Sequence, residues 1–262
     1  MSFCKAKPSD RYRQLLAEYQ RLHGEGDRRL GLAPEETFEG HSLLPHVENI
    51  AVMCRRHHAV TLLDYGAGKG MQYKIACVTV EGRDKQFTIP VHWGIRYLTC
   101  YDPAYPPFAQ LPAGRTFDGV ICTDVLEHCP AEDLPWIIAE LFELAGNFVY
   151  AGVASFPAMK HLANGENAHC TIRPDAWWRE LIRSAAAKNP EVDYFFAFHH
   201  ADDTAARGQY HWTTMLGRGL EDVVRGETFG KVPQLLVMAN SSGAPGCMPA
   251  SARGFRQRQS ET

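Results

Sequence analysis

A glycine-rich turn follows a strongly apolar run in the sequence TLLDYGAGKGMQY, residues 61–73. The run is typical of a strand buried on both faces, and Asp64 precedes the glycines Gly66, Gly68 and Gly70. Glycines gather where the backbone turns sharply or approaches a ligand closely. These residue types therefore predict a ligand-binding turn at the end of a strand.

Two phosphate-binding motifs do not fit the spacing of this turn. A P-loop ends in Gly-Lys followed by Ser or Thr, whose hydroxyl reaches magnesium, whereas Lys69 is followed by Gly70 and Met71. A dinucleotide fingerprint has the spacing GxGxxG, but the glycines here are spaced GxGxG. The turn is therefore not predicted to hold a nucleotide phosphate.

Acidic residues also close the next two strand-like runs of the chain. Asp102 ends RYLTCYD, and its carboxylate can accept hydrogen bonds from two hydroxyl groups at once. Asp124 ends FDGVICTD, at the carboxyl end of a strand, which is where open α/β sheets bind ligands. An insertion with β character, residues 78–97, separates Asp102 from the glycine turn. The alternative role for Asp102 is that of a turn-forming residue in an Asp-Pro pair.

Strand-like and helical runs alternate over most of the sequence. Helices are expected at 11–23, 41–58, 131–145 and 174–188, and strands at 60–65, 96–102, 117–124, 147–155, 192–200 and 234–240. A hydrophilic stretch, residues 199–219, is expected to interrupt the last two strands. This alternation predicts an α/β fold with a mostly parallel sheet.

Together, the glycine turn, Asp102 and the stretch FDGVICTDVLEHCPAEDLPW resemble class I S-adenosylmethionine (SAM)-dependent methyltransferases. In that family an acid ends the first strand, the glycine turn passes beneath the methionine moiety, and a second acid binds the ribose hydroxyls. The resemblance covers residues 58–150 well and 167–240 loosely. It implies that SAM is the cofactor, bound by Asp64, Tyr65, Gly66, Ala67, Gly68, Gly70, Asp102, Pro103, Thr123, Asp124 and Val125.

The resemblance also implies the fold and its main departure from the family. We expect a Rossmann-like α/β fold, with a mostly parallel sheet of the seven-stranded type and helices on both faces. Residues 103–117, PAYPPFAQLPAGRTF, leave no room for the usual helix and third strand. The third, edge strand is therefore expected to be reduced or missing, and no adenine-binding acid is identified.

Methyl transfer is an in-line displacement, so the enzyme aligns the nucleophile and, for a hydroxyl, accepts its proton. His128 in VLEH and His169 in GENAHC are the candidate catalytic bases, and hydrogen bonding to a backbone carbonyl is the alternative role for a loop histidine. In a helical turn, Asp124, Glu127 and His128 would share one face, because they stand at i, i+3 and i+4.

A divalent metal is a further expectation drawn from the resemblance. Small-RNA 3′-terminal methyltransferases and ubiquinone-pathway O-methyltransferases hold a metal with an acid-x-x-Glu-His pattern and a distant histidine. The matching residues here are Asp124, Glu127, His128 and His169. Carboxylate and imidazole ligands suit manganese, iron or zinc better than magnesium. The same VLEH also occurs in relatives without a metal.

Composition narrows the location and the partners of the chain. Its 262 residues carry a formal net charge of -3, which disfavours a general nucleic-acid binder. The eight cysteines form no CxxC pair, and no signal peptide or membrane span is found, so we expect a cytoplasmic protein. The expected parts are an N-terminal helical lid or packing segment (1–58), a SAM-binding methyltransferase domain (59–240) and a disordered tail (241–262).

The expected function is transfer of a methyl group from SAM to oxygen or nitrogen of a small-molecule or sugar-like acceptor. One alternative is metal-assisted 2′-O-methylation of an RNA end, against which the acidic balance argues. Another is a nonenzymatic binding module with the same fold, against which the intact glycines and Asp102 argue. A nicotinamide-dependent dehydrogenase is the third, and the GxGxG spacing argues against it.

Overall fold

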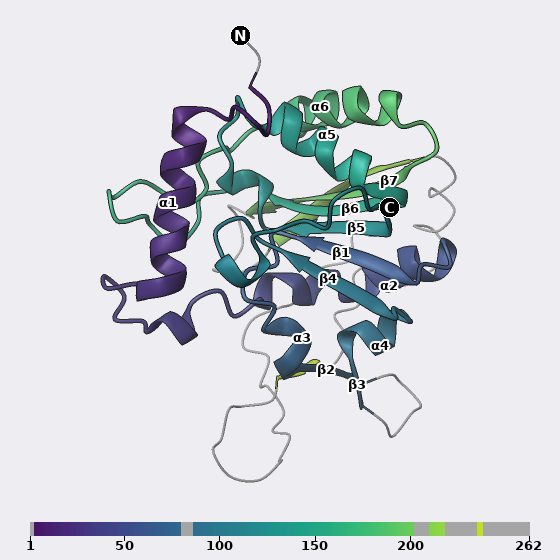
Figure 1. The fold of residues 1–262 in the computed structure, drawn as a ribbon, viewed down its shortest axis with the longest axis horizontal. Coiled ribbons are helices and arrows are strands. Elements are labelled where there is room, and N and C mark those ends of the chain that lie inside the picture. Colours follow the sequence, from purple (N-terminus) through teal and green to yellow (C-terminus); the bar gives the residue numbers. More distant parts are fainter. Residues whose placement is uncertain (1–2, 80–85, 202–209, 218–234, 238–262) are drawn as a thin grey trace.

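The computed structural model describes residues 3–79, 86–201, 210–217 and 235–237, and these form an α/β fold around one large sheet (Figure 1). The strand order is β4-β1-β5-β6-β7-β8, and each neighbouring pair is parallel except β7 and β8. The bounds are β1 Thr61–Tyr65, β4 Tyr97–Tyr101, β5 Phe117–Thr123, β6 Ala145–Ala154, β7 Asp193–Ala201 and β8 Tyr210–Leu216. The predicted mostly parallel α/β architecture is confirmed.

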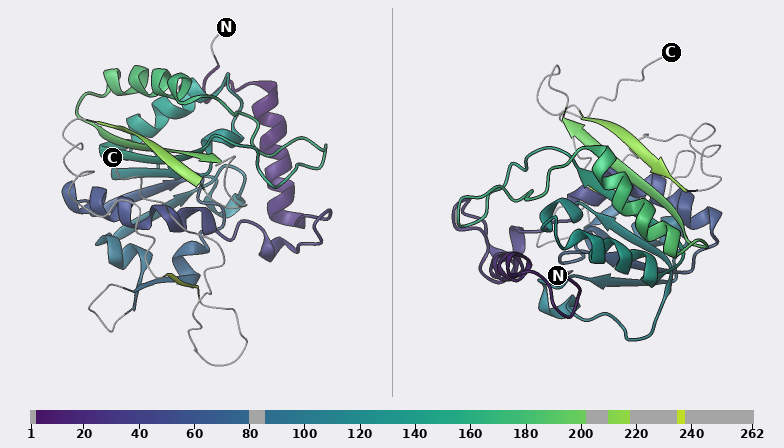
Figure 2. Two further views of the ribbon diagram at one scale, coloured as in Figure 1. Left: turned by 180° about the vertical axis from the view of Figure 1, so that it is seen from behind. Right: turned by 90° about the horizontal axis from the view of Figure 1, so that it is seen from above.

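Helices cover both faces of this sheet (Figures 1 and 2). Helices α5 (Leu134–Leu144) and α6 (Asp175–Lys188) pack on one face, and α2 (Val47–Arg56) and α4 (Ile89–Trp93) pack on the other. Neighbouring residues of a strand point to opposite faces, so Val149 joins the first core and Tyr150 the second. Because both faces are buried, the central strands have the near-continuous apolar sequences that predicted them.

The missing third strand is also borne out in the part of the chain that the structure describes. There β4 has β1 as its only strand partner. The following segment contains a single 3₁₀ turn, η3 (Pro106–Phe108), and no strand. Its prolines lack the amide hydrogens that a further strand would need.

The C-terminal strands differ from the prediction in two ways. Residues 210–216, expected within a hydrophilic connection, form β8, which pairs antiparallel with β7. The run expected at 234–240 is described only as β9 (Leu235–Val237), and it lies outside the main sheet. It pairs with β2 (Ala76–Thr79), which also pairs with β3 (Gln86–Thr88), so the insertion has the predicted β character. A short apolar run does not encode which strand it will pair with.

The N-terminal segment begins with α1 (Asp10–Glu25), which matches the helix expected at 11–23. The Ser9 hydroxyl caps it by accepting a hydrogen bond from the Tyr12 amide at 3.0 Å. The helix expected at 41–58 is divided into a 3₁₀ helix, η2 (His41–His46), and α2, because Pro45 lies within the first part. The short elements η1 (Pro34–Glu36) and α3 (Gln72–Ile75) complete this side of the fold.

Two statements complete the description of the chain. No helix in the described ranges is long and apolar enough to cross a membrane. The predicted tail, residues 241–262, lies outside the described residues.

Candidate active site

A cavity of about 620 Å³ lies at the carboxyl ends of β1, β4 and β5. Its other walls come from α1, the segment that follows α1, and the connection between β6 and α6. The predicted cofactor residues that line it are Asp64, Tyr65, Gly66, Ala67, Gly68, Asp102, Pro103, Thr123, Asp124 and Val125. The predicted contact Gly70 does not line it. A Cβ atom at Gly70 would lie 3.3 Å from a ring carbon of Phe108, on the packed side of the turn.

The glycine turn is held in a left-handed conformation and pinned to the neighbouring strand. Gly66 has a φ of +87° and Gly68 a φ of +57°, which side chains rarely allow. The amides of Gly66 and Ala67 both donate to the carbonyl of Tyr101, at 2.7 and 3.0 Å. A Cβ atom at Gly66 would lie only 2.3 Å from a Val125 methyl group, so this glycine also allows the turn after β5 to approach.

Asp64, in β1, is buried and hydrogen-bonded on the cavity wall. Its Oδ2 accepts from the Tyr73 hydroxyl at 2.7 Å and from the Gln72 amide at 3.2 Å. Burial raises the pKa of Asp64 to about 7, against the opposing effect of these hydrogen bonds. This carboxylate can therefore carry a charge near neutral pH when a cationic ligand favours it.

Asp102, which follows β4, has the turn-forming role that was one of its two predicted alternatives, and it also contacts the glycine turn. Its Oδ1 accepts from the Ala104 amide at 2.8 Å, which is the turn-forming role, and its Oδ2 accepts from the Gly68 amide at 2.9 Å. Burial raises its pKa to about 6 although three backbone amides oppose the shift. Asp102 thus fastens its own turn to the glycine turn, and it lines the cavity.

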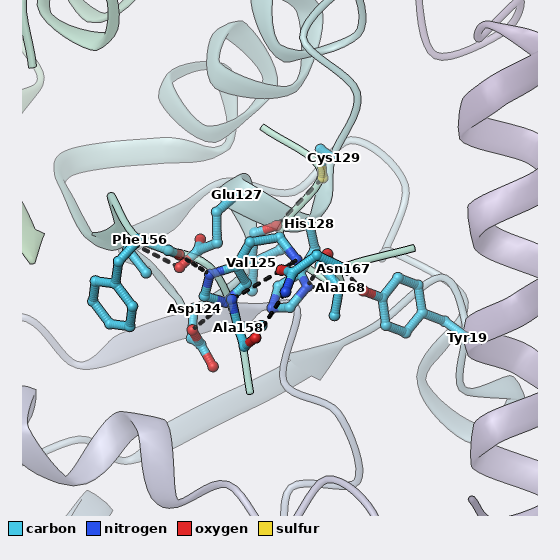
Figure 3. Close-up of polar contacts among 12 residues, drawn as sticks. Tyr19, Asp124, Val125, Glu127, His128, Cys129, Phe156, Ala158, Asn167 and Ala168 are labelled. Atoms are coloured by element: carbon cyan, nitrogen blue, oxygen red, sulfur yellow. Dashed lines mark hydrogen bonds and ion pairs between the residues drawn. The ribbon is translucent and has the colours of Figure 1, made fainter. Parts of the chain in front are cut away.

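Asp124 and two histidines, His128 and His169, also line the cavity, and Figure 3 shows Asp124 and His128 with their polar contacts. Asp124, His128 and His169 each offer one ligand atom, and these atoms lie within 4.8 Å of one another. Asp124 Oδ1 is 3.8 Å from His169 Nε2, and the Asp124 side chain is 44% exposed. Asp124 also has a φ of +59°, a left-handed conformation that aspartate tolerates better than most residues.

Backbone carbonyls fix the orientation of both imidazole rings. His128 Nδ1 lies 2.9 Å from the Ala168 carbonyl, and His169 Nδ1 lies 2.6 Å from the Phe156 carbonyl. Because a carbonyl oxygen only accepts, the Nδ1 of His169 donates to Phe156, and in the neutral ring Nε2 keeps a lone pair. His128 Nδ1 also lies 2.8 Å from the Tyr19 hydroxyl, which can donate to it or accept from it. Burial, the largest effect, lowers the pKa of His128 and favours its neutral form. Metal-binding histidines are held in the same way.

Glu127, the fourth predicted metal ligand, lies outside this cluster. Its Oε1 accepts from the Ala154 amide at 2.7 Å, and its Oε2 has no hydrogen-bond partner among the described residues. Complete burial and then the charge of Asp124 raise its pKa well above the ordinary value. The prediction assumed a helical turn from Asp124 onward. The left-handed Asp124 and the 3₁₀ turn η4 (Leu126–His128) instead direct Glu127 toward β6.

Several cavity residues carried no signal in the sequence, because they come from segments without a motif. Helix α1 contributes Tyr19, whose hydroxyl lies 2.8 Å from His128 Nδ1, and His23. The His23 ring stacks on Phe38 with ring centroids 3.9 Å apart. Burial, followed by the charges of two lysines, lowers the pKa of His23 to about 4. The β6–α6 connection contributes Lys160 as well as the predicted His169.

Comparisons with known proteins add little to this geometry. No protein-family model and no curated protein matches the sequence. Among solved structures, the chain is similar to an O-methyltransferase family protein from Burkholderia thailandensis, with a TM-score of 0.42 and 12% sequence identity. This likeness covers 79% of this chain and 70% of that chain. At this identity and score it assigns neither an activity nor a ligand, so function is argued from the site.

Proposed function

We propose that this protein is a SAM-dependent methyltransferase of the class I type, which methylates oxygen or nitrogen of a small-molecule or sugar-like acceptor. One observation carries the proposal. The left-handed glycine turn and the acids Asp64 and Asp102 line a single cavity at the carboxyl ends of adjacent parallel strands. Ligands of open α/β sheets bind at that edge.

The chemistry of the cavity wall suits SAM better than a phosphate ligand. SAM brings a sulfonium, an ammonium group and two ribose hydroxyls. The wall offers the carboxylates of Asp64, Asp102 and Asp124 to these positive and hydrogen-donating groups. A cavity of about 620 Å³ is within the size range of small-molecule sites.

The residues beside the cofactor region have two tasks in a methyl transfer. They align the acceptor atom with the methyl group, and they remove a proton when the acceptor is a hydroxyl. The Nε2 lone pair of neutral His169 is suited to the second task, because its Nδ1 hydrogen is donated to the Phe156 carbonyl, and His128 lies beside it. His169 is the stronger candidate, since its Nε2 also lies near Asp124, which would stabilise the protonated ring.

A metal-assisted version of this activity is the second candidate, and the cluster of Asp124, His128 and His169 favours it. Two imidazoles and one carboxylate suit manganese, iron or zinc. A bound divalent ion would lower the pKa of an acceptor hydroxyl. An RNA end fits less well than a small acceptor, because the chain has a net charge of -3 and offers no broad basic surface for a polyanion.

Calorimetry tests the cofactor assignment. We expect SAM and its demethylated product to bind the wild-type protein, and NAD not to bind. The matched pair of variants is Asp102→Ala, on the cavity wall, and Asp118→Ala, whose carboxylate accepts hydrogen bonds from Val60 and Thr61 at 2.8 Å. Only the first should weaken SAM binding. NAD binding without SAM binding would refute the proposal.

A further inference from the structure

Lys160 is the only lysine or arginine among the described residues that line the cavity. It is half-buried, and the same wall carries five acidic side chains. These acids are Glu36, Glu39, Asp64, Asp102 and Asp124. Asp64 and Asp102 belong to the proposed cofactor side and Asp124 to the cluster with the two histidines, and none of these roles explains the single ammonium group of Lys160.

The backbone places Lys160 in the same hydrogen-bonded unit as the two histidines. The Lys160 carbonyl accepts from the Ala168 amide at 3.1 Å, and the Ala168 carbonyl accepts from His128 Nδ1 at 2.9 Å. Asn167 ties the base of this loop together, because its Oδ1 accepts from the amides of Ala158 and His169. The position of Lys160 is therefore fixed relative to the imidazoles.

The ammonium group of Lys160 lies over an aromatic ring, 5.1 Å from the centroid of Phe38. In the described parts of the chain it forms no ion pair with any of the nearby carboxylates. A half-buried cation is stabilised by an anion with which it can form charge-assisted hydrogen bonds. The ligand is the remaining source of that anion.

We propose, on the basis of the proposed function, that Lys160 binds a carboxylate of the methyl acceptor, so the acceptor is a hydroxy or amino acid rather than a neutral alcohol. The acceptor is favoured over the carboxylate of SAM because Lys160 belongs to the β6–α6 connection, which also carries His169. The proposed cofactor residues follow β1, β4 and β5. Phe38 and the fully exposed Met159, both on the cavity wall, provide an apolar surface for the body of such an acid.

Matched acid and amide probes test this assignment without knowledge of the natural acceptor. The pairs are salicylate with salicylamide and glucuronate with glucuronamide, and their binding is measured by ligand-observed NMR with the demethylated cofactor product present. We expect at least one acid to bind the wild-type protein about tenfold more tightly than its amide, the scale of a hydrogen bond to a charged group. Lys160→Met should abolish this preference and Lys160→Arg should retain it. Lys188→Met, which changes an exposed lysine of α6, is the control.

The outcomes separate this inference from the proposed function. Equal binding of acids and amides, or of neither, by the wild-type protein overturns the role of Lys160. Calorimetry of Lys160→Met with SAM provides the second readout. Unchanged SAM affinity supports the acceptor assignment, whereas a tenfold loss assigns the ammonium group to the cofactor carboxylate and overturns it. If the wild-type protein binds no SAM, the proposed function fails, but the acid preference can still be measured without cofactor.

Discussion

The acids at β1 and β4 differ from the acid after β5 in how their carboxylates are held. Asp64 and Asp102 are buried and take hydrogen bonds from amides and a hydroxyl. Asp124 is nearly half exposed, and its carboxylate lies 3.8 Å from His169 Nε2. The first two carboxylates are fixed before any ligand arrives, whereas the third has room to bind one.

This difference favours separate roles for the β1–β4 half and the β5–β6 half of the cavity. In the proposed function, the β1–β4 half binds the cofactor with carboxylates that hydrogen bonds already hold in place. The β5–β6 half keeps two imidazole rings and a carboxylate close together, so it can take up a proton or a cation. Polar groups with unused hydrogen-bonding capacity gather where chemistry occurs.

The largest expected effect is on the β5–β6 half. His169→Ala should reduce methyl transfer by roughly 10²–10⁴, the usual contribution of a general base, whether the ring binds a proton or a metal. The measurement is turnover of an accepted substrate with and without EDTA. His161→Ala, an exposed histidine of the same loop, should retain full activity.

Chelation with EDTA then distinguishes metal-assisted catalysis from general-base catalysis by His169. If EDTA removes turnover, leaves SAM binding intact and is reversed by manganese, the three side chains act as metal ligands. If EDTA has no effect, His169 acts as a base. A fully active His169→Ala variant would contradict both and leave only alignment of the substrates.

A smaller effect is expected on the β1–β4 half. Asp102→Ala should weaken SAM binding by about 1.5–3 kcal/mol, because hydrogen bonds to a charged group are lost. Calorimetry at pH 7.5 measures the change. A loss below about tenfold would restrict Asp102 to its observed bonds with Ala104 and Gly68, and would remove it from the cofactor site.

The smallest expected effect is a pH dependence of SAM binding that arises from Asp102, in the β1–β4 half. Burial raises the pKa of Asp102 to about 6, so lowering the pH from 7.5 to 5.5 protonates it and removes the charge that the ribose hydroxyls favour. At pH 5.5 this single group should weaken SAM binding about fourfold. Calorimetry of the wild type and of Asp102→Asn checks this, since the variant should lack that part of the pH profile.

Ionisation of Asp102 strengthens SAM binding as the pH rises, but it lowers the free energy of unfolding of the unliganded protein. An acid with a raised folded-state pKa binds its proton more tightly in the folded than in the unfolded chain. Its ionisation therefore destabilises the fold as the pH rises from about 4 toward 7. The difference in unfolding free energy between Asp102→Asn and the wild type should grow across that range, and a constant difference would contradict the shifted pKa.

The sequence predicted the strand-end acids well because each one closes an apolar run, and parallel strands bring their carboxyl ends to one edge. It also predicted that Asp124, His128 and His169 would converge. It misplaced Glu127, because the i, i+3, i+4 argument requires a helix and the backbone at Asp124 is left-handed. The positions of Tyr19, His23 and Lys160 depend on long-range packing of α1 against the β6–α6 connection, which no local pattern encodes.

The contact between Gly66 and Val125 couples the positions of the two halves of the site, because the glycine turn after β1 packs against the turn after β5. A Cβ atom at Gly66 would overlap the Val125 side chain, so the two turns lie in direct van der Waals contact. Val125 follows Asp124 directly in the chain, and the glycine turn lies at the proposed cofactor end. The size of the Val125 side chain therefore sets how closely the glycine turn can approach the turn that carries Asp124.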